Sequence, residues 1–220
     1  MNRRVRELSV ETLDHLPPAC RACVFWEVSG ACRGPRRDAR VGREAKEAWW
    51  QATQLEWGAP GRAVFIDDAL VGYAIFGPTV HFPRVREYSR PSEDALLLAT
   101  LWIDPEHRGQ GLATMLLQSV LREVHRRGGR ALEAYGARSA VDLAGPCMIP
   151  ETFLSSHGFQ VISEESRLPL LRLDLRQTVR WQEVSHALGE VLSTLARRER
   201  QPARTPGRPA LEIREAEPSR

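Results

Sequence analysis

An apolar segment that runs directly into a glycine-rich loop and then an amphipathic helix constrains this fold more than any other feature. Residues 94–103, DALLLATLWI, are apolar on both faces, which indicates a central strand that is covered on both sides. The loop IDPEHRGQGLA follows over residues 103–113. Residues 112–130, LATMLLQSVLREVHRRGGR, then place apolar residues at helical spacing, with arginines in the last turn and two glycines after it. We therefore expect a strand, a loop and a helix in direct succession.

The loop carries residues suited to binding an anion. Gly109 and Gly111 fall where the strand has ended and the helix begins. Because glycine has no Cβ, its backbone N–H group can approach a phosphate closely, and the helix N-terminus adds a favourable dipole. Arg108 supplies a permanent positive charge at the same place. The segment therefore predicts a site for a pyrophosphate or a similar group.

Two common nucleotide-binding motifs do not fit this loop. A P-loop needs a lysine after its last glycine, and the only lysine of the chain is Lys46. A dinucleotide fingerprint, GxGxxG, would align with Gly109 and Gly111 but would then meet Thr114. That fold also turns directly from strand to glycine, whereas here residues 104–108 intervene. Glu133 stands near the distance expected of a ribose-binding carboxylate, but a lone GxG is a weak signal.

The remaining elements mix strands and helices without strict alternation. Residues 61–77, GRAVFIDDALVGYAIFG, hold two β-rich runs around Asp67 and Asp68, which predicts a hairpin. The mixture predicts the α+β class with a mixed sheet of strands and covering helices. The other expected strands are residues 3–8, 130–135, 159–162 and 168–175, and the other expected helices are residues 17–28, 42–55 and 150–157.

The composition is that of a folded domain with a C-terminal extension. With 220 residues, of which 42% are apolar, the chain can bury one substantial core, which we assign to residues 1–176. Apolar residues at helical spacing predict an amphipathic helix over residues 177–199, which packs either on the domain or on a second copy in a homodimer. Residues 200–220 are rich in proline and charge, which predicts a disordered tail.

Hydropathy and net charge bear on the expected cellular location of the protein and on the kinds of partner that it binds. No apolar run approaches the length of a membrane span, and the N-terminus MNRRVRELSVET lacks the apolar region of a signal peptide. A cytoplasmic location without membrane association is therefore expected. The net charge of +3 is small and gives no indication of a nucleic-acid partner.

The run LWIDPEHRGQGLATMLL resembles motif A of the GNAT (Gcn5-related N-acetyltransferase) superfamily. The motif, R/Q-x-x-G-x-G/A, is filled by Arg108, Gly111 and Ala113, and the element order and the HGF triplet at residues 157–159 extend the resemblance over residues 3–175. It implies a GNAT-like fold with a central, mostly antiparallel sheet of six to seven strands flanked by helices. It also implies that acetyl-CoA (coenzyme A) is bound by Trp102, Ile103, Arg108, Gly109, Gln110, Gly111, Leu112, Ala113 and Thr114.

The activity that the resemblance implies is transfer of an acetyl group to a primary amine, of a small molecule or a peptide, by direct attack in a ternary complex. The usual proton-transfer groups are missing, because residues 96–101 hold no carboxylate or histidine and Leu154 stands where many relatives carry a tyrosine acid. A catalytically weak acyl-CoA-binding regulator is therefore an alternative, as is an enzyme in which water takes the proton. The candidate catalytic residues are Glu27, Tyr135 and Cys147, with Glu93 and His81 as further candidates.

Cysteines form a second motif near the N-terminus. Cys20 and Cys23 stand in PPACRACVFWE, at the start of an expected helix whose dipole would lower a thiol pKa. The CxxCxFWE pattern ahead of the GNAT-like core resembles a branch of that superfamily common in actinobacteria. Reduced structural thiols, a redox- or acyl-sensing pair and a metal-responsive module remain open. The spacing carries no second CxxC, so no metal ligands are assigned.

Overall fold

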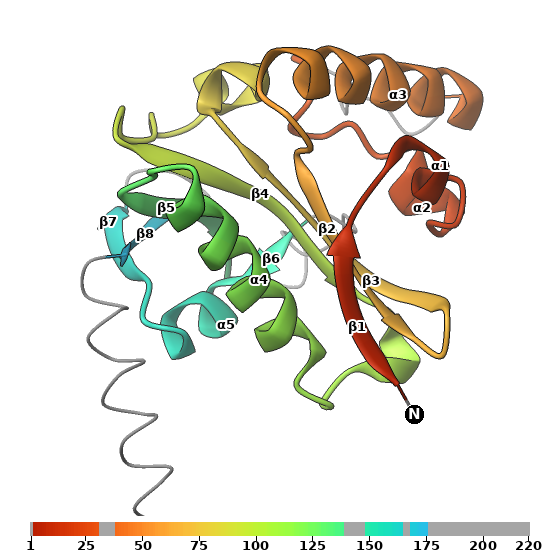
Figure 1. The fold of residues 1–220 in the computed structure, drawn as a ribbon. Helices are drawn as coiled ribbons and strands as arrows, with labels where there is room; N and C mark the ends of the chain where they lie inside the picture. The colour runs from red at the N-terminus through yellow and green to blue at the C-terminus, as the bar shows by residue number, and fades with distance from the viewer. Residues whose placement is uncertain (1, 31–37, 139–147, 165–167, 176–220) are drawn as a thin grey trace, which may run out of the picture. The chain divides into compact units, whose positions relative to one another are not determined.

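The computed structural model describes residues 2–30, 38–138, 148–164 and 168–175. These residues form an α+β fold, which confirms the predicted class (Figure 1). The strands are β1 (Arg3–Glu7), β2 (Gly61–Ile66), β3 (Ala69–Gly77), β4 (Ala95–Ile103), β5 (Ala131–Ala137), β6 (Ile149–Pro150), β7 (Gln160–Ser163) and β8 (Leu170–Asp174). The helices are α1 (Val10–Leu13), α2 (Pro18–Arg21), α3 (Ala39–Glu56), α4 (Leu112–Arg126) and α5 (Glu151–Ser156), with 3-10 turns at η1 (Thr79–His81), η2 (Pro83–Glu87) and η3 (Pro105–His107).

In the described residues, one sheet of eight strands holds the domain together. Its order is β1-β2-β3-β4-β5-β8-β7, and the short β6 pairs with β5. The pairing is antiparallel except between β4 and β5 and between β5 and β6, so the predicted mostly antiparallel sheet is confirmed, with eight strands rather than six to seven. Helices α4 and α5 bury Leu116 and Leu154 against one face, and α1 and α3 bury Leu13 and Trp50 against the other.

A β-bulge in the middle of strand β4 shifts the alternation of its side chains between the two faces of the sheet. Ile75 of β3 pairs with Thr100 and Phe76 pairs with Leu98, so Ala99 is an extra residue, a β-bulge. Before the bulge Leu98 faces the α4 side of the sheet, and after it Leu101 faces that same side, although strict alternation would turn Leu101 away. The bulge therefore puts both Leu98 and Leu101 on the α4 side of the sheet, shortly before the glycine-rich loop.

Strands β4 and β5 diverge after three paired residues. Ala95 to Leu97 pair in parallel with Ala131 to Glu133, and β5 then pairs with β6 at Gly136. In the part of the chain that the structure describes, the β5-facing edge of β4 from Leu98 onward pairs with no strand. The backbone N–H and C=O groups on that edge are therefore left for another partner.

The predicted hairpin is present and its turn has a clear cause. Asp67 and Asp68 have φ angles of 47° and 72°, the left-handed pair that a two-residue type I′ turn requires. The Asp67 carboxylate accepts a hydrogen bond from the backbone N–H of Asn2 at 2.7 Å, and Asp68 pairs with Arg4. Two aspartates thus hold β1 beside the hairpin.

The helix predicted over residues 17–28 begins at the Pro17–Pro18 pair as expected, but its predicted extent to residue 28 is wrong. Helix α2 ends at Arg21, and the separate short helix α1 precedes it. The Glu27 carboxylate accepts a hydrogen bond from the backbone N–H of Trp26, and such local side-chain bonds compete with helical ones. Trp26 also stacks on Tyr135 of β5, at 4.7 Å between ring centroids, and this packing takes the chain away from a helical path.

The predicted C-terminal helix (residues 177–199) and tail (residues 200–220) lie outside the described residues. So does Cys147. Among the helices that the structure describes, none combines the length and the apolar character needed to cross a membrane.

Candidate functional site

The loop after β4 and the start of α4 form an open cradle of backbone. Gly109 and Gly111 have φ angles of 74° and 78°, a left-handed conformation that glycine adopts without strain. A Cβ built at either residue would meet no atom within 4 Å, so the space above both is open. Gly111 is the N-cap of α4 and supplies no side-chain cap, which leaves the first amide groups of the helix without an intrahelical acceptor. We call residues 108–114 the glycine cradle.

Neighbouring residues hold the glycine cradle in place. Arg3 of β1 donates from its guanidinium to the backbone oxygen of Gln110 at 2.9 Å. Asp104 caps η3 by accepting the N–H of Glu106 at 2.9 Å, and its own N–H donates to Val71 of β3. The cradle and the loop that leads to it are thus held by β1 and β3 before any ligand arrives, which lowers the ordering cost of binding.

Positive charge and dipole converge on the cradle. Arg108 is exposed, and its Nε donates to the backbone oxygen of Ile103 at 3.2 Å, which leaves its other nitrogens open to a ligand. The N-terminal end of α4, a helix of 15 residues, adds its unbonded amides and the positive end of its dipole to the cradle. The chemistry on offer is recognition of a diphosphate by amides, dipole and one guanidinium.

Thr114, in the first turn of α4, is tied to α5. His157 Nε2 lies 2.9 Å from Thr114 Oγ1, and His157 Nδ1 lies 2.8 Å from the backbone oxygen of Phe153. This contact was not expected from the sequence. The HGF triplet was the available signal, but it gave no indication that its histidine contacts the cradle.

Glu27 is held in a buried ion pair. Its Oε1 lies 2.7 Å from Nζ of Lys46, and both side chains are 2% exposed. Its second oxygen accepts the N–H of Trp26 at 3.1 Å. A catalytic base needs a free oxygen within reach of substrate, so these contacts favour a structural role for Glu27.

Tyr135 is buried in an aromatic cluster. Its hydroxyl donates a hydrogen bond to the backbone oxygen of Ser89. Its ring stacks on the Trp26 ring, and its ring centroid lies 5.6 Å from that of Tyr88. Burial, with a smaller contribution from the charge of Glu133, raises the pKa of Tyr135 well above its ordinary value. Glu27 and Tyr135 thus both contact Trp26, one through its backbone N–H and the other through its ring.

The two further candidates lie at the surface or in structural contacts. His81 accepts the Trp49 indole N–H on its backbone oxygen at 2.6 Å, and its Nδ1 lies 3.8 Å from Glu56. The Glu93 side chain is 92% exposed, with Arg90 at 3.8 Å. These contacts give neither residue a defined proton-transfer position.

The model of the acetyltransferase (GNAT) family matches residues 25–144, which is more than half of the chain and contains the whole cradle. The chain belongs to the GNAT acetyltransferase family. No curated protein sequence matches it.

Solved structures share the GNAT fold at low sequence identity. The PaiA N-acetyltransferase from Thermoplasma acidophilum, in complex with coenzyme A, is 16% identical with a TM-score of 0.53, covering 79% of this chain and 99% of that one. An N-acetyltransferase from Staphylococcus aureus Mu50 is 17% identical with a TM-score of 0.54, covering 80% and 99%. YncA from Salmonella typhimurium, with its cofactor acetyl-CoA, is 20% identical with a TM-score of 0.52, covering 79% and 94%.

Leu154 of this GNAT protein is a core residue. It is fully buried and belongs to the cluster that α4 and α5 form with the sheet, together with Leu98 and Leu112. A tyrosine at this position would have to place its hydroxyl among apolar side chains or displace them. The structure thus explains why the position is apolar here.

The Cys20 thiol of this GNAT protein departs from expectation. Burial raises the pKa of the Cys20 thiol, against a smaller lowering by a hydrogen bond from Tyr73, so the expected lowering by a helix dipole is wrong. The reason is that α2 spans only four residues and Cys20 is buried. In the described ranges no cluster of three or more metal-ligating side chains occurs. The CxxCxFWE branch assignment stays a prediction.

Proposed function

We propose that this protein transfers an acetyl group from acetyl-CoA to a primary amine by direct attack in a ternary complex. The observation that carries the proposal is the open glycine cradle at the N-terminus of α4, at the end of a β4 strand whose edge has parted from β5. The residues present fit the diphosphate of coenzyme A, because the cradle offers amides and a guanidinium and no side chain fills it. When bound, the thioester would supply an activated acetyl group.

The chain's own backbone would perform the binding and polarising steps. Arg108 to Thr114 would hold the diphosphate, and Trp102 and Ile103 at the end of β4 would lie along the pantetheine arm. The free edge of β4 beyond the Ala99 bulge would offer an N–H to the thioester carbonyl oxygen, where negative charge develops. These steps need main-chain groups only, so they do not depend on the residue at position 154.

Proton removal from the amine is assigned to water. Glu27 and Tyr135 are engaged with Lys46 and with Ser89, and Cys147 lies outside the described residues. An amine that is already neutral can attack without a positioned base, and water then takes the proton after attack. Cys147 remains a candidate for protonating the departing thiolate.

A second function is favoured by one observation. Leu154 fills the core where relatives carry a tyrosine acid, which suits a protein that binds acyl-CoA and transfers slowly or not at all. Such a protein would act as an acyl-CoA-binding regulator, with the same cradle.

Product formation separates the two functions. A panel of small amines and peptide N-termini is incubated with acetyl-CoA and the protein, and acetylated products are measured by mass spectrometry. The test variant is Gly111→Glu, and the matched control is Gly128→Glu, at the other end of α4, where φ is 76° and a Cβ also meets no atom within 4 Å. The enzyme proposal expects product that Gly111→Glu abolishes and Gly128→Glu retains. Coenzyme A binding without product from any amine would favour the regulator.

A further inference from the structure

His157 links α5 to the glycine cradle through a single hydroxyl group. Its Nε2 lies 2.9 Å from Thr114 Oγ1, its Nδ1 lies 2.8 Å from the Phe153 backbone oxygen, and its ring packs on the Phe153 ring at 4.2 Å between centroids. Thr114 is in the first turn of α4, whose amides form part of the cradle. The imidazole is therefore separated from the proposed diphosphate site by the Thr114 hydroxyl.

The contacts of the ring define where its protons lie. A carbonyl oxygen only accepts hydrogen bonds, so Nδ1 carries a hydrogen and donates it to Phe153. Ser156 Oγ also lies 3.1 Å from Nδ1, but its hydroxyl donates to the same Phe153 oxygen at 2.8 Å. In the neutral ring Nε2 is then the acceptor, and the Thr114 hydroxyl must donate to it. The one proton of that hydroxyl is thereby directed at His157, and its oxygen would meet a phosphate oxygen with lone pairs only.

Resting on the proposed function, we propose that His157 and Thr114 form a proton-linked positioning pair for the diphosphate of coenzyme A. On binding, Nε2 takes up one proton from solvent. The new N–H group then donates a hydrogen bond to Thr114 Oγ1. The hydroxyl rotates and donates its own proton to a phosphate oxygen. No covalent bond other than the new N–H forms, and the ligand gains one hydrogen bond together with a nearby imidazolium charge.

The charged groups that the structure describes near His157 and Thr114 offer no anionic partner to a protonated His157. On α5 the acidic residue is Glu151, which is paired with Arg138. The first two turns of α4, residues 112–119, carry no charged side chain. From the loop, Arg108 donates to Ile103, and from β1, Arg3 donates to Gln110. Among the described residues, the histidines that form ion pairs with carboxylates are His81 and His107 and not His157, so a bound diphosphate would be the anionic partner of His157.

Calorimetry with dephospho-coenzyme A tests the proposal. This probe keeps the diphosphate but lacks the 3′-phosphate, which itself gains and loses a proton near neutral pH. Titrations near pH 6.5 in two buffers with different heats of ionisation give the number of protons taken up on binding. The wild-type protein is expected to take up protons on binding, because a bound diphosphate favours the charged form of the imidazole. His157→Gln, which keeps an acceptor but cannot titrate there, is expected to take up almost none.

Two variants of Thr114 make the test specific. Thr114→Val, which keeps the shape and removes the hydroxyl, should lose the proton uptake and bind about fivefold more weakly at pH 6, with little change at pH 8. Thr114→Ser should restore both. Should His157→Gln fail to fold, the comparison of Thr114→Val with Thr114→Ser alone tests the proposal.

The outcomes separate this proposal from the one it rests on. Wild-type protein that binds the probe with the same proton uptake as His157→Gln and Thr114→Val would overturn the positioning pair and leave the acetyltransferase proposal intact. Wild-type protein that does not bind the probe at all would overturn both.

Discussion

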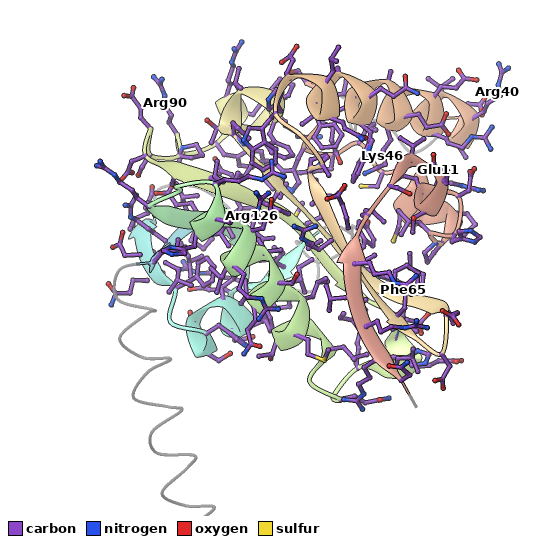
Figure 2. All side chains as sticks on the ribbon, viewed as in Figure 1. Glu11, Arg40, Lys46, Phe65, Arg90 and Arg126 are labelled. Carbon is purple, nitrogen blue, oxygen red and sulfur yellow. The ribbon has the colours of Figure 1, made fainter. Side chains whose placement is uncertain are left out.

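Lys46 Nζ lies 2.7 Å from Glu27 Oε1, and each side chain is only 2% exposed. Figure 2 labels Lys46 on the inner side of α3, the helix that covers this face of the sheet. Lys46 is the only lysine in a chain that otherwise uses arginine. A compact ammonium fits a buried site against one carboxylate oxygen, whereas a guanidinium would need room for its fork. The pair fastens α3 to the segment that follows α2.

Removing one partner of this pair should destabilise the domain strongly. Lys46→Met leaves the Glu27 carboxylate buried without its counter-charge, which is expected to lower the free energy of unfolding by about 3–5 kcal/mol. Urea denaturation measures the change. The double variant Lys46→Met with Glu27→Leu should recover most of the loss, because no charge then remains buried. A single variant as stable as the wild-type protein would contradict the structural role given to Glu27.

The Glu123 carboxylate should make stability depend on pH in the acid range. Its hydrogen bond from Arg126, helped by Arg127 and by Arg62, lowers the pKa of Glu123 from 4.5 to about 2 (Figure 2 labels Arg126 on α4). The contribution is thus fully present above pH 4.5 and is lost as the pH falls from 4.5 toward 2. Glu123→Gln should cost about 2 kcal/mol at pH 7, and the difference from wild type should shrink below pH 4.5.

Denaturation curves measured between pH 2 and pH 7 would show this pattern. The matched control is Glu44→Gln on the surface of α3, where a 59% exposed carboxylate lies 3.9 Å from Arg40. Such an exposed pair is expected to contribute little at any pH. A pH-independent difference between Glu123→Gln and wild type would show that the arginines around Glu123 do not act through its charge.

Tyr135→Phe should affect stability more than turnover. The variant leaves the Ser89 backbone oxygen without its donor and should lower the free energy of unfolding by about 1 kcal/mol. If proton transfer runs through water, kcat for the best amine in the panel should change by less than about threefold. A loss of a hundredfold or more, in a protein that still folds and binds coenzyme A, would restore Tyr135 as a catalytic acid.

Leu154→Tyr should not create a missing catalytic acid. Leu154 has no exposed surface, so the larger side chain overpacks the core between α5 and the sheet and should lower stability by about 1–3 kcal/mol. Steady-state kinetics should show no rise in kcat, and Leu154→Met is the control that keeps the volume similar. A tenfold gain in kcat would mean that the position opens onto the reacting groups.

The cradle was predictable from sequence because its determinants are local. Arg108, Gly109 and Gly111 lie within four positions, and the left-handed φ values follow from glycine itself. The bulge at Ala99 was not predictable, since it depends on how β3 pairs with β4. A short run of apolar residues does not indicate where the register between two strands shifts.

The roles of the proposed catalytic residues depend on partners far away in the sequence. Glu27, in the segment that follows α2, meets Lys46 of α3, and Tyr135 meets the backbone oxygen of Ser89. Residue type gave both a capacity for proton transfer, but tertiary contacts decide whether that capacity is free. The bond between His157 and Thr114 joins two helices in the same way.

The most direct test of the glycine cradle is binding of coenzyme A itself. Calorimetric titration of the wild-type protein, of Gly111→Glu and of Gly128→Glu compares one added carboxylate at the two ends of α4, at residues with similar backbone conformation. The cradle predicts saturable binding by the wild-type protein and by Gly128→Glu, and at least a hundredfold loss in Gly111→Glu. Equal binding by all three proteins, or no binding by the wild-type protein, would contradict it.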